Sequence, residues 1–386
     1  MRRIGMVLGA LGAILAVAVL LGARSAEAGE PIRIGAIVSV TGPASFLGEP
    51  ERNTAKMLEE DLNRDGGLLG RKVEIIVYDD ESDATKAVTA VDRLLKRDRA
   101  VTIVGPSTSG STLAIVPKIE EAKVPLLSCA AARKIVEPPR HWVFKVAASD
   151  ILAVKKIFQD LKRRGLTKVA TLTASDAYGA GGREDIKELA PQMGIALVAD
   201  EVFGPKDTDM TAQLTRIKGT AAQAIIVWGT NPGPAVIARN RVQLRIATPM
   251  YMSSGVASKK FIELAGAENA EGILLPAGRL LVEGQLPAGH PQKRVLAEYI
   301  KEYERRFKQP VSTFGGHAWD AVMLAAQAIR DAKSAEPVAI RDAVEKVRGF
   351  YGTGGEFNFS AEDHSGLSED AFVMIRITKG EWEMLR

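Results

Sequence analysis

Short apolar segments alternate with helix-length amphipathic segments along most of this chain. A first set of apolar, strand-like segments covers residues 32–38, 73–78, 101–104 and 125–127. Predicted helices lie between them, around residues 51–64, 84–97 and 110–122. A second set of strand-like segments, again separated by helices, covers residues 169–173, 196–202, 224–227, 249–252 and 272–275. Such alternation is typical of parallel sheets with helices on both faces.

The pattern predicts an α/β protein with two Rossmann-like lobes, each a mostly parallel sheet flanked by helices. A chain of 386 residues is also too long for one ordinary core. Residues 291–347 are helical in pattern, and the tail from 354 to 384 has the pattern of strands. We expect residues 29–147 and 279–350 to form lobe 1, and residues 148–278 and 351–386 to form lobe 2, joined by three hinge crossings.

Ligands of open α/β sheets bind outside the carboxyl ends of the strands, so two facing lobes enclose a cleft. Three chain passages between the lobes favour hinge closure over independent movement of the lobes. The sequence therefore predicts a protein that closes around a small molecule.

The N-terminus has the three parts of an export signal. Arg2 and Arg3 precede the apolar stretch 4–21, and the small-residue pattern Ala26-Glu-Ala28 follows it. We interpret residues 1–28 as a cleaved signal peptide and Gly29 as the first mature residue, because the stretch is short for a membrane anchor. The mature protein is expected in the periplasm. The single cysteine, Cys129, leaves no intramolecular disulfide to form.

Composition and motifs argue against several function classes. The formal net charge is +4, and acidic and basic residues are interleaved, so no nucleic-acid partner is expected. The four histidines are isolated and show no metal-ligand spacing, and neither a nucleophile elbow nor a Walker motif is present. We expect no enzymatic activity, no catalytic residue, no metal and no cofactor.

The run from Gly105 to Thr112 carries the clearest functional signal. It joins an apolar strand to a predicted helix and has the sequence Gly-Pro-Ser-Thr-Ser-Gly-Ser-Thr. Free backbone N–H groups and the helix dipole favour an anion at such a junction. Taken alone, the segment fits equally well a serine that only caps the helix.

Several segments, in this order and spacing, resemble the leucine/isoleucine/valine-binding proteins, the extracytoplasmic receptors of ABC importers with the type I periplasmic binding fold. They include Ile34–Pro43, Leu62–Arg71 with Tyr78-Asp-Asp80, Gly105–Ser109 with Pro117, Val124–Ser128, Tyr178-Gly179 and Gly380-Glu-Trp382. The resemblance covers nearly all of the mature chain. It implies a monomer that delivers its ligand to a permease and an ATPase at the inner membrane.

The resemblance also implies roles for individual residues. Ser109 matches the position that grips the ligand carboxylate in amino-acid-binding members. Ala132 stands where a threonine is expected, and Ser254 stands where an acid would pair with the ligand ammonium. Leu47, with Phe46 beside it, falls where an aromatic residue often lies. The expected ligand-binding residues are Phe46, Leu47, Ser107, Ser109, Ala130, Ala131, Ala132, Tyr178, Trp228, Asn231 and Ser254.

The missing threonine and acid point away from free amino acids, because a buried ammonium without a carboxylate is strongly disfavoured. Segments 130–138, 141–144 and 363–367 resemble a branch of the family that binds aromatic and related organic acids. The sequence-based hypothesis is therefore an aromatic or phenylpropanoid acid. Two alternatives stay open: an amino-acid receptor, with Asp176 or Glu49 supplying the acid, and a ligand-sensing regulatory protein on the same fold.

Overall fold

The structure is a computed structural model, and it describes residues 29–385. The predicted signal peptide lies outside these residues. The first sheet has five parallel strands in the order β2-β1-β3-β4-β5. Their bounds are β1 Ile32–Val38, β2 Val73–Asp79, β3 Thr102–Val104, β4 Leu126–Ser128 and β5 Val143–Lys145.

The second sheet has seven strands in the order β14-β13-β10-β9-β8-β6-β7. The five strands from β6 to β10 run parallel, whereas β13 and β14 are antiparallel additions at one edge. The bounds are β6 Lys168–Ala174, β7 Ala196–Phe203, β8 Ala224–Trp228, β9 Met250–Met252, β10 Leu274–Ala277, β13 Val373–Thr378 and β14 Glu381–Met384. The predicted α/β fold with two mostly parallel sheets is confirmed.

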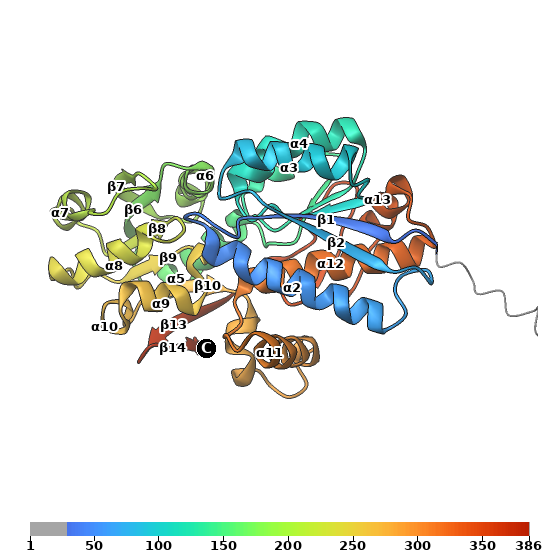
Figure 1. The fold of residues 1–386 in the computed structure, drawn as a ribbon. Helices are drawn as coiled ribbons and strands as arrows, with labels where there is room; N and C mark the ends of the chain where they lie inside the picture. Colours follow the sequence, from blue (N-terminus) through green and yellow to red (C-terminus); the bar gives the residue numbers. More distant parts are fainter. Residues whose placement is uncertain (1–28, 386) are drawn as a thin grey trace, which may run out of the picture.

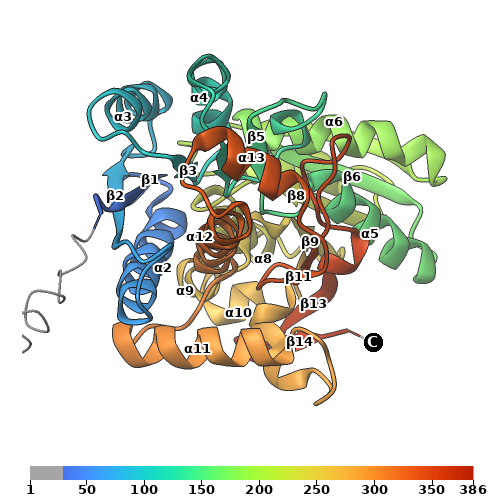
Figure 2. The same cartoon turned by 90° about the vertical axis from the view of Figure 1, so that its right-hand side faces the viewer.

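Helices cover both faces of the first sheet. Figure 1 shows α3 and α4 on one side of the sheet and α2 and α12 on the other. Figure 2, turned by 90°, shows the same layers, with α11 beneath α2 and α12. The bounds are α2 Ser45–Arg64, α3 Ala84–Lys96, α4 Ser109–Ala122, α11 Lys293–Phe307, α12 Thr313–Ala332 and α13 Pro337–Glu345.

The second sheet is covered in the same way, and alternate residues of its strands face opposite layers. Val169 and Ile226 pack against α5 and α6, whereas Ala170 and Ile225 pack against α7, α8 and α9. The helices are α5 Asp150–Arg163, α6 Ala177–Gln192, α7 Thr211–Lys218, α8 Gly233–Gln243, α9 Lys259–Ala265 and α10 Ala267–Ala270. A central strand buried on both faces explains the continuous apolar runs in the sequence.

Two details differ from the sequence-based expectation. The short strand β5 was not predicted, because its three residues carry no periodicity that distinguishes strand from loop. Helix α2 begins at Ser45 rather than near residue 51, and Pro50 lies inside it. Gly48 permits the close approach of this first part of the helix to the end of β1, since a Cβ there would lie 2.2 Å from the carbonyl carbon of Ser39.

The C-terminal segment first follows lobe 1 and then enters the second sheet. Its short strands β11 (Phe350–Tyr351) and β12 (Glu356–Phe357) pair with each other. Phe359 packs edge-on against Phe144 of β5, and His364 stacks on the same ring at 4.1 Å. These contacts favour assigning residues 351–367 to lobe 1. The boundaries of the two lobes stay a prediction.

Within residues 29–385, none of the helices has the length and apolar character that crossing a membrane requires. Trp228, at the end of β8, is fully buried, and its ring lies 6.1 Å from that of Tyr178. Gly182 of α6 makes room for the indole, because a Cβ there would lie 2.2 Å from its Nε1 atom.

We predict that Gly182→Ala lowers the free energy of unfolding by about 1–3 kcal/mol, because the new methyl group overpacks the space beside Trp228. The neighbouring variant Gly181→Ala is the control, since its Cβ would meet only Ala132 at 3.8 Å. Chemical denaturation of both variants measures the difference. Equal stability of the two variants would contradict the packing described for Trp228.

Candidate functional site

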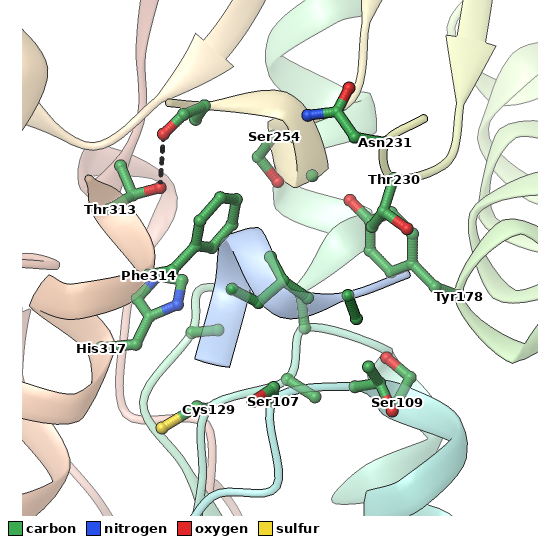
Figure 3. A pocket seen from close by; sticks show the side chains of 18 of the residues that line it. Ser107, Ser109, Cys129, Tyr178, Thr230, Asn231, Ser254, Thr313, Phe314 and His317 are labelled. Carbon is green, nitrogen blue, oxygen red and sulfur yellow. Dashed lines mark hydrogen bonds between the residues drawn. The ribbon is translucent and has the colours of Figure 1, made fainter. Parts of the chain in front are cut away.

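A cavity of about 370 Å³ lies between the two sheets. Its walls come from the segments that directly follow β3, β4 and β5 of the first sheet and β6, β8 and β9 of the second. The carboxyl ends of both sets of parallel strands therefore face one space, as expected for ligand sites of this architecture. Figure 3 shows Ser107 and Ser109 on one side of the cavity and Asn231 and Ser254 on the opposite side.

Most of the residues expected from the sequence line this cavity. They are Leu47, Ser107, Ser109, Ala130, Ala131, Tyr178, Asn231 and Ser254.

Three expected residues, Phe46, Ala132 and Trp228, do not line the cavity. Phe46 packs edge-on against Phe314, at 5.5 Å between ring centroids. Ala132 is buried, and Trp228 lies beneath Tyr178. The expectation that these three residues face the cavity is therefore corrected.

The start of α4, where an anion was expected to bind, lies at one end of the cavity. Thr108 caps the helix by accepting a hydrogen bond from the N–H of Ser111 at 3.2 Å. The helix is therefore capped by Thr108 and not by a serine. Ser109 and Gly110, in the first turn of the helix, line the cavity. Ser109 accepts the N–H of Ala132 at 3.3 Å, so its own O–H proton is available to a ligand. The first amides of a helix have no acceptor within it, and they favour a carboxylate here.

Ser107 was expected among the ligand-binding residues, but its hydroxyl is already engaged. It accepts the N–H of Ser39 at 2.9 Å and is hydrogen-bonded to the buried Glu51. Burial raises the pKa of Glu51 well above its usual range, although the hydrogen bond to Ser107 opposes this. Ser107 therefore ties β1 and α2 to the loop after β3.

The amides after β4 are also partly used. The N–H of Ala130 donates to Ser128 Oγ at 3.2 Å, and that of Ala132 donates to Ser109. With the hydroxyl of Ser107 also engaged, Ser109, the first turn of α4 and the N–H of Ala131 remain as the groups expected to bind a carboxylate.

The wall from the second sheet carries uncharged polar groups. Asn231 is 4% exposed, and both its amide oxygen and its amide nitrogen lack a hydrogen-bond partner among the described residues. The buried hydroxyl of Tyr178 also lacks a hydrogen-bond partner among the described residues. Burial raises the pKa of Tyr178, and the nearby Asp150 adds to this, so the phenol is neutral. These groups are positioned to hydrogen-bond a ligand.

Charged groups are few in the lining. Among the described residues that line the cavity, Asp176 is the only carboxylate and Lys206 the only lysine or arginine. One oxygen of Asp176 caps α6 by accepting the N–H of Gly179 at 2.8 Å. Its charge nevertheless lies at the cavity wall, whereas Glu49 is exposed and does not line it. Asp176 is therefore the acid that could face a ligand ammonium.

Helix α12 contributes a side of the cavity that the sequence did not indicate. Thr313, Phe314 and His317 line it, and Thr313 Oγ1 donates to the carbonyl of Ala257 at 3.0 Å (Figure 3). That hydrogen bond joins the two lobes across the cavity. Phe314 packs with Ala44 and Leu47 of the α2 region and gives the cavity an apolar wall. These residues reach the site because α12, which is distant in the sequence from the strands of the first sheet, packs against β3 and β4.

Ion pairs link the lobes beside the cavity. Arg133, after β4, contacts Asp185 of α6 at 3.0 Å and Glu188 at 2.5 Å. Lys134 contacts Glu184 at 2.6 Å. Burial raises the pKa of Asp185 to about 6, against the lowering effect of Arg133. Asp185 therefore depends on Arg133 to remain ionised.

The family model for periplasmic binding proteins matches residues 31–381. The chain belongs to the periplasmic binding protein family. Within residues 29–385 of this periplasmic binding protein, no group of three or more His, Cys, Asp or Glu side chains is arranged to hold a metal ion.

Curated relatives and solved structures agree with this assignment. The chain is 25% identical, over 82% of its length and 83% of the relative's, to the leucine-, isoleucine-, valine-, threonine- and alanine-binding protein of Pseudomonas aeruginosa. It is similar to an extracellular ligand-binding receptor from Rhodopseudomonas palustris, with a TM-score of 0.86 and 29% identity over 92% of this chain and 99% of that one.

A third similar protein was solved with a ligand. It is the branched-chain amino acid transporter substrate binding protein LivJ from Streptococcus pneumoniae, in complex with isoleucine. The TM-score is 0.82 and the identity 26%, over 92% of this chain and 99% of that one. Homologues of the chain are thus binding proteins for transported solutes.

We predict that Ser109→Ala weakens carboxylate binding by about 1–3 kcal/mol, because the ligand loses a hydroxyl donor in a buried site. Titration calorimetry with any carboxylate that binds the wild type measures the loss. Ser107→Ala is the comparison, although it also removes a contact of Glu51. Unchanged affinity in Ser109→Ala would place the anion elsewhere.

We also predict that Arg133→Ala lowers ligand affinity about fivefold, a coupling of about 1 kcal/mol, because the closed arrangement loses a link between the lobes. Arg163→Ala is the matched control, since Arg163 pairs with Asp160 of its own helix. The loss should shrink at high salt, where ion pairs are screened. An equal effect of both variants would contradict a role in closure.

Proposed function

We propose that this protein is the solute-binding component of an ABC importer and that it traps a small carboxylate between its lobes in the periplasm. The observation that carries the proposal is the cavity between the two sheets, with Ser109 and the first turn of α4 at one wall. Membership of the periplasmic binding protein family supports it. The partners would be a permease and an ATPase, with no chemical step on the ligand.

Binding would be coupled to closure because the two lobes contribute different contacts. Ser109 belongs to lobe 1, whereas Tyr178, Asn231 and Ser254 follow strands of the second sheet. A ligand that contacts both sets stabilises the closed arrangement over the open one by its differential interactions. The closed form is then the signal that the permease reads.

An amino acid is the ligand class that the relatives favour. The names of the Pseudomonas and Streptococcus proteins refer to aliphatic amino acids and to threonine. An amino acid requires an anionic partner for its ammonium, and Asp176 is the carboxylate in the lining. An amino-acid ligand would therefore span from Ser109 to the N-terminus of α6.

An aromatic or related organic acid is the second candidate, and a different observation favours it. Ser254 occupies the place where an acid was expected, and the lining is rich in apolar side chains. These are Leu47, Phe203, Leu280, Phe314 and Phe372. Such a cavity suits a flat or branched apolar body with a single carboxylate.

A thermal-shift screen of amino acids and aromatic acids tests the proposal. A ligand at a hundredfold over its dissociation constant should stabilise the folded state by about 2.7 kcal/mol. We expect at least one small carboxylate to raise the melting temperature by a corresponding amount. Stabilisation only by neutral sugars or by cations would contradict the proposed function.

The variant Asp176→Asn separates the two ligand classes. Asparagine retains the helix cap but removes the charge. If the ligand is an amino acid, binding should weaken by about 1.5–3 kcal/mol, because a charge-assisted hydrogen bond is lost. Binding of an organic acid without an amine should not weaken. Asp83→Asn, at the exposed cap of α3, is the control; amino-acid binding that is insensitive to Asp176→Asn would exclude Asp176 as the ammonium partner.

A further inference from the structure

The cavity contains an unused imidazole at the side formed by α12. His317 lies one helical turn after Phe314, with 6.1 Å between the ring centroids, and both residues line the cavity. Figure 3 shows this pair opposite Tyr178. No side chain of the described residues hydrogen-bonds the ring, and its Nδ1 atom is buried without a partner.

The imidazole is uncharged at neutral pH. Burial lowers the pKa of His317 to about 4, and the Lys145 ammonium adds to this effect against a smaller opposing contribution from the backbone of Cys129. A neutral imidazole donates from one nitrogen and accepts at the other. It therefore suits an uncharged hydroxyl or carbonyl group better than a second carboxylate.

The position of His317 separates it from the anion-binding end. Ser109 belongs to α4, whereas His317 belongs to α12 and lies beside the apolar ring of Phe314 (Figure 3). A ligand whose carboxylate lies at Ser109 would extend its other end toward this wall. A purely aliphatic end would leave the buried ring nitrogen unpaired, which disfavours such a ligand.

We propose that His317 is a specificity-determining residue that selects carboxylates with a second, uncharged polar group, such as a hydroxyl, at the end away from the carboxylate. Asn231 supports this inference independently, because its buried amide is also unpaired in the lobe-2 wall. The inference rests on the proposed function and deepens it. The ligand class becomes a hydroxylated or carbonyl-bearing small acid.

Matched ligand pairs test the proposal. Threonine and valine have nearly the same shape and differ by a hydroxyl in place of a methyl group, and 4-hydroxybenzoate and benzoate differ by one hydroxyl. We expect the wild type to bind the hydroxylated member of at least one pair about tenfold or more tightly, because sites built for a hydroxyl discriminate against analogues without it. Titration calorimetry measures both members of each pair.

Variants of His317 assign the selectivity to its ring. His317→Leu should reduce the affinity ratio of that pair to about threefold or less, and His317→Gln should retain part of it, since glutamine still donates and accepts. Phe314→Leu is the matched control, because it should weaken both members of the pair equally. Circular dichroism melting establishes that each variant is folded.

The measurements distinguish failure of the proposal for His317 from failure of the proposed function. An unchanged affinity ratio in folded His317→Leu overturns the proposal, as does a wild type that binds both members of each pair equally or prefers the one without the hydroxyl. If no carboxylate of either kind binds the wild type, the proposed function itself fails, and this inference fails with it. Loss of selectivity in His317→Leu alone, with Phe314→Leu unchanged in selectivity, supports it.

Discussion

The parallel arrangement of the strands is the constraint on which the site depends. Parallel strands deliver all their following loops and helix N-termini to one edge, and the two sheets turn these edges toward the same cavity. The start of α4 thereby faces the starts of α6 and of the loop after β8. One wall is suited to an anion, and the other carries uncharged hydrogen-bonding groups. The proposed closure and the proposed recognition of a ligand would both depend on this geometry.

The sequence predicted the parts of the molecule that local periodicity determines. Apolar β-branched runs predicted nine of the parallel strands closely, because strands buried on both faces contain few polar residues. Ser109, Tyr178, Asn231 and Ser254 were also expected at the site, from the resemblance to a known family and from their place after predicted strands. Their positions in the cavity match that reasoning, whereas their roles in binding stay predictions.

The remainder of the site depends on contacts between distant segments. Ser107 was assigned to the ligand, but Glu51, which comes from α2, engages its hydroxyl. Trp228 was expected in the cavity, but Gly182 of α6 leaves space that buries the indole. His317 gave no signal as an isolated histidine. Only the packing of α12 against α2 brings it to the cavity.

Recognition of a carboxylate at Ser109 is the step on which the proposed function depends. Calorimetric titration of a bound acid and of its primary amide tests this most directly, because the two ligands share their shape and differ in charge. We expect the acid to bind at least about tenfold more tightly, since a charged acceptor forms the stronger hydrogen bonds. Equal or tighter binding of the amide would contradict it.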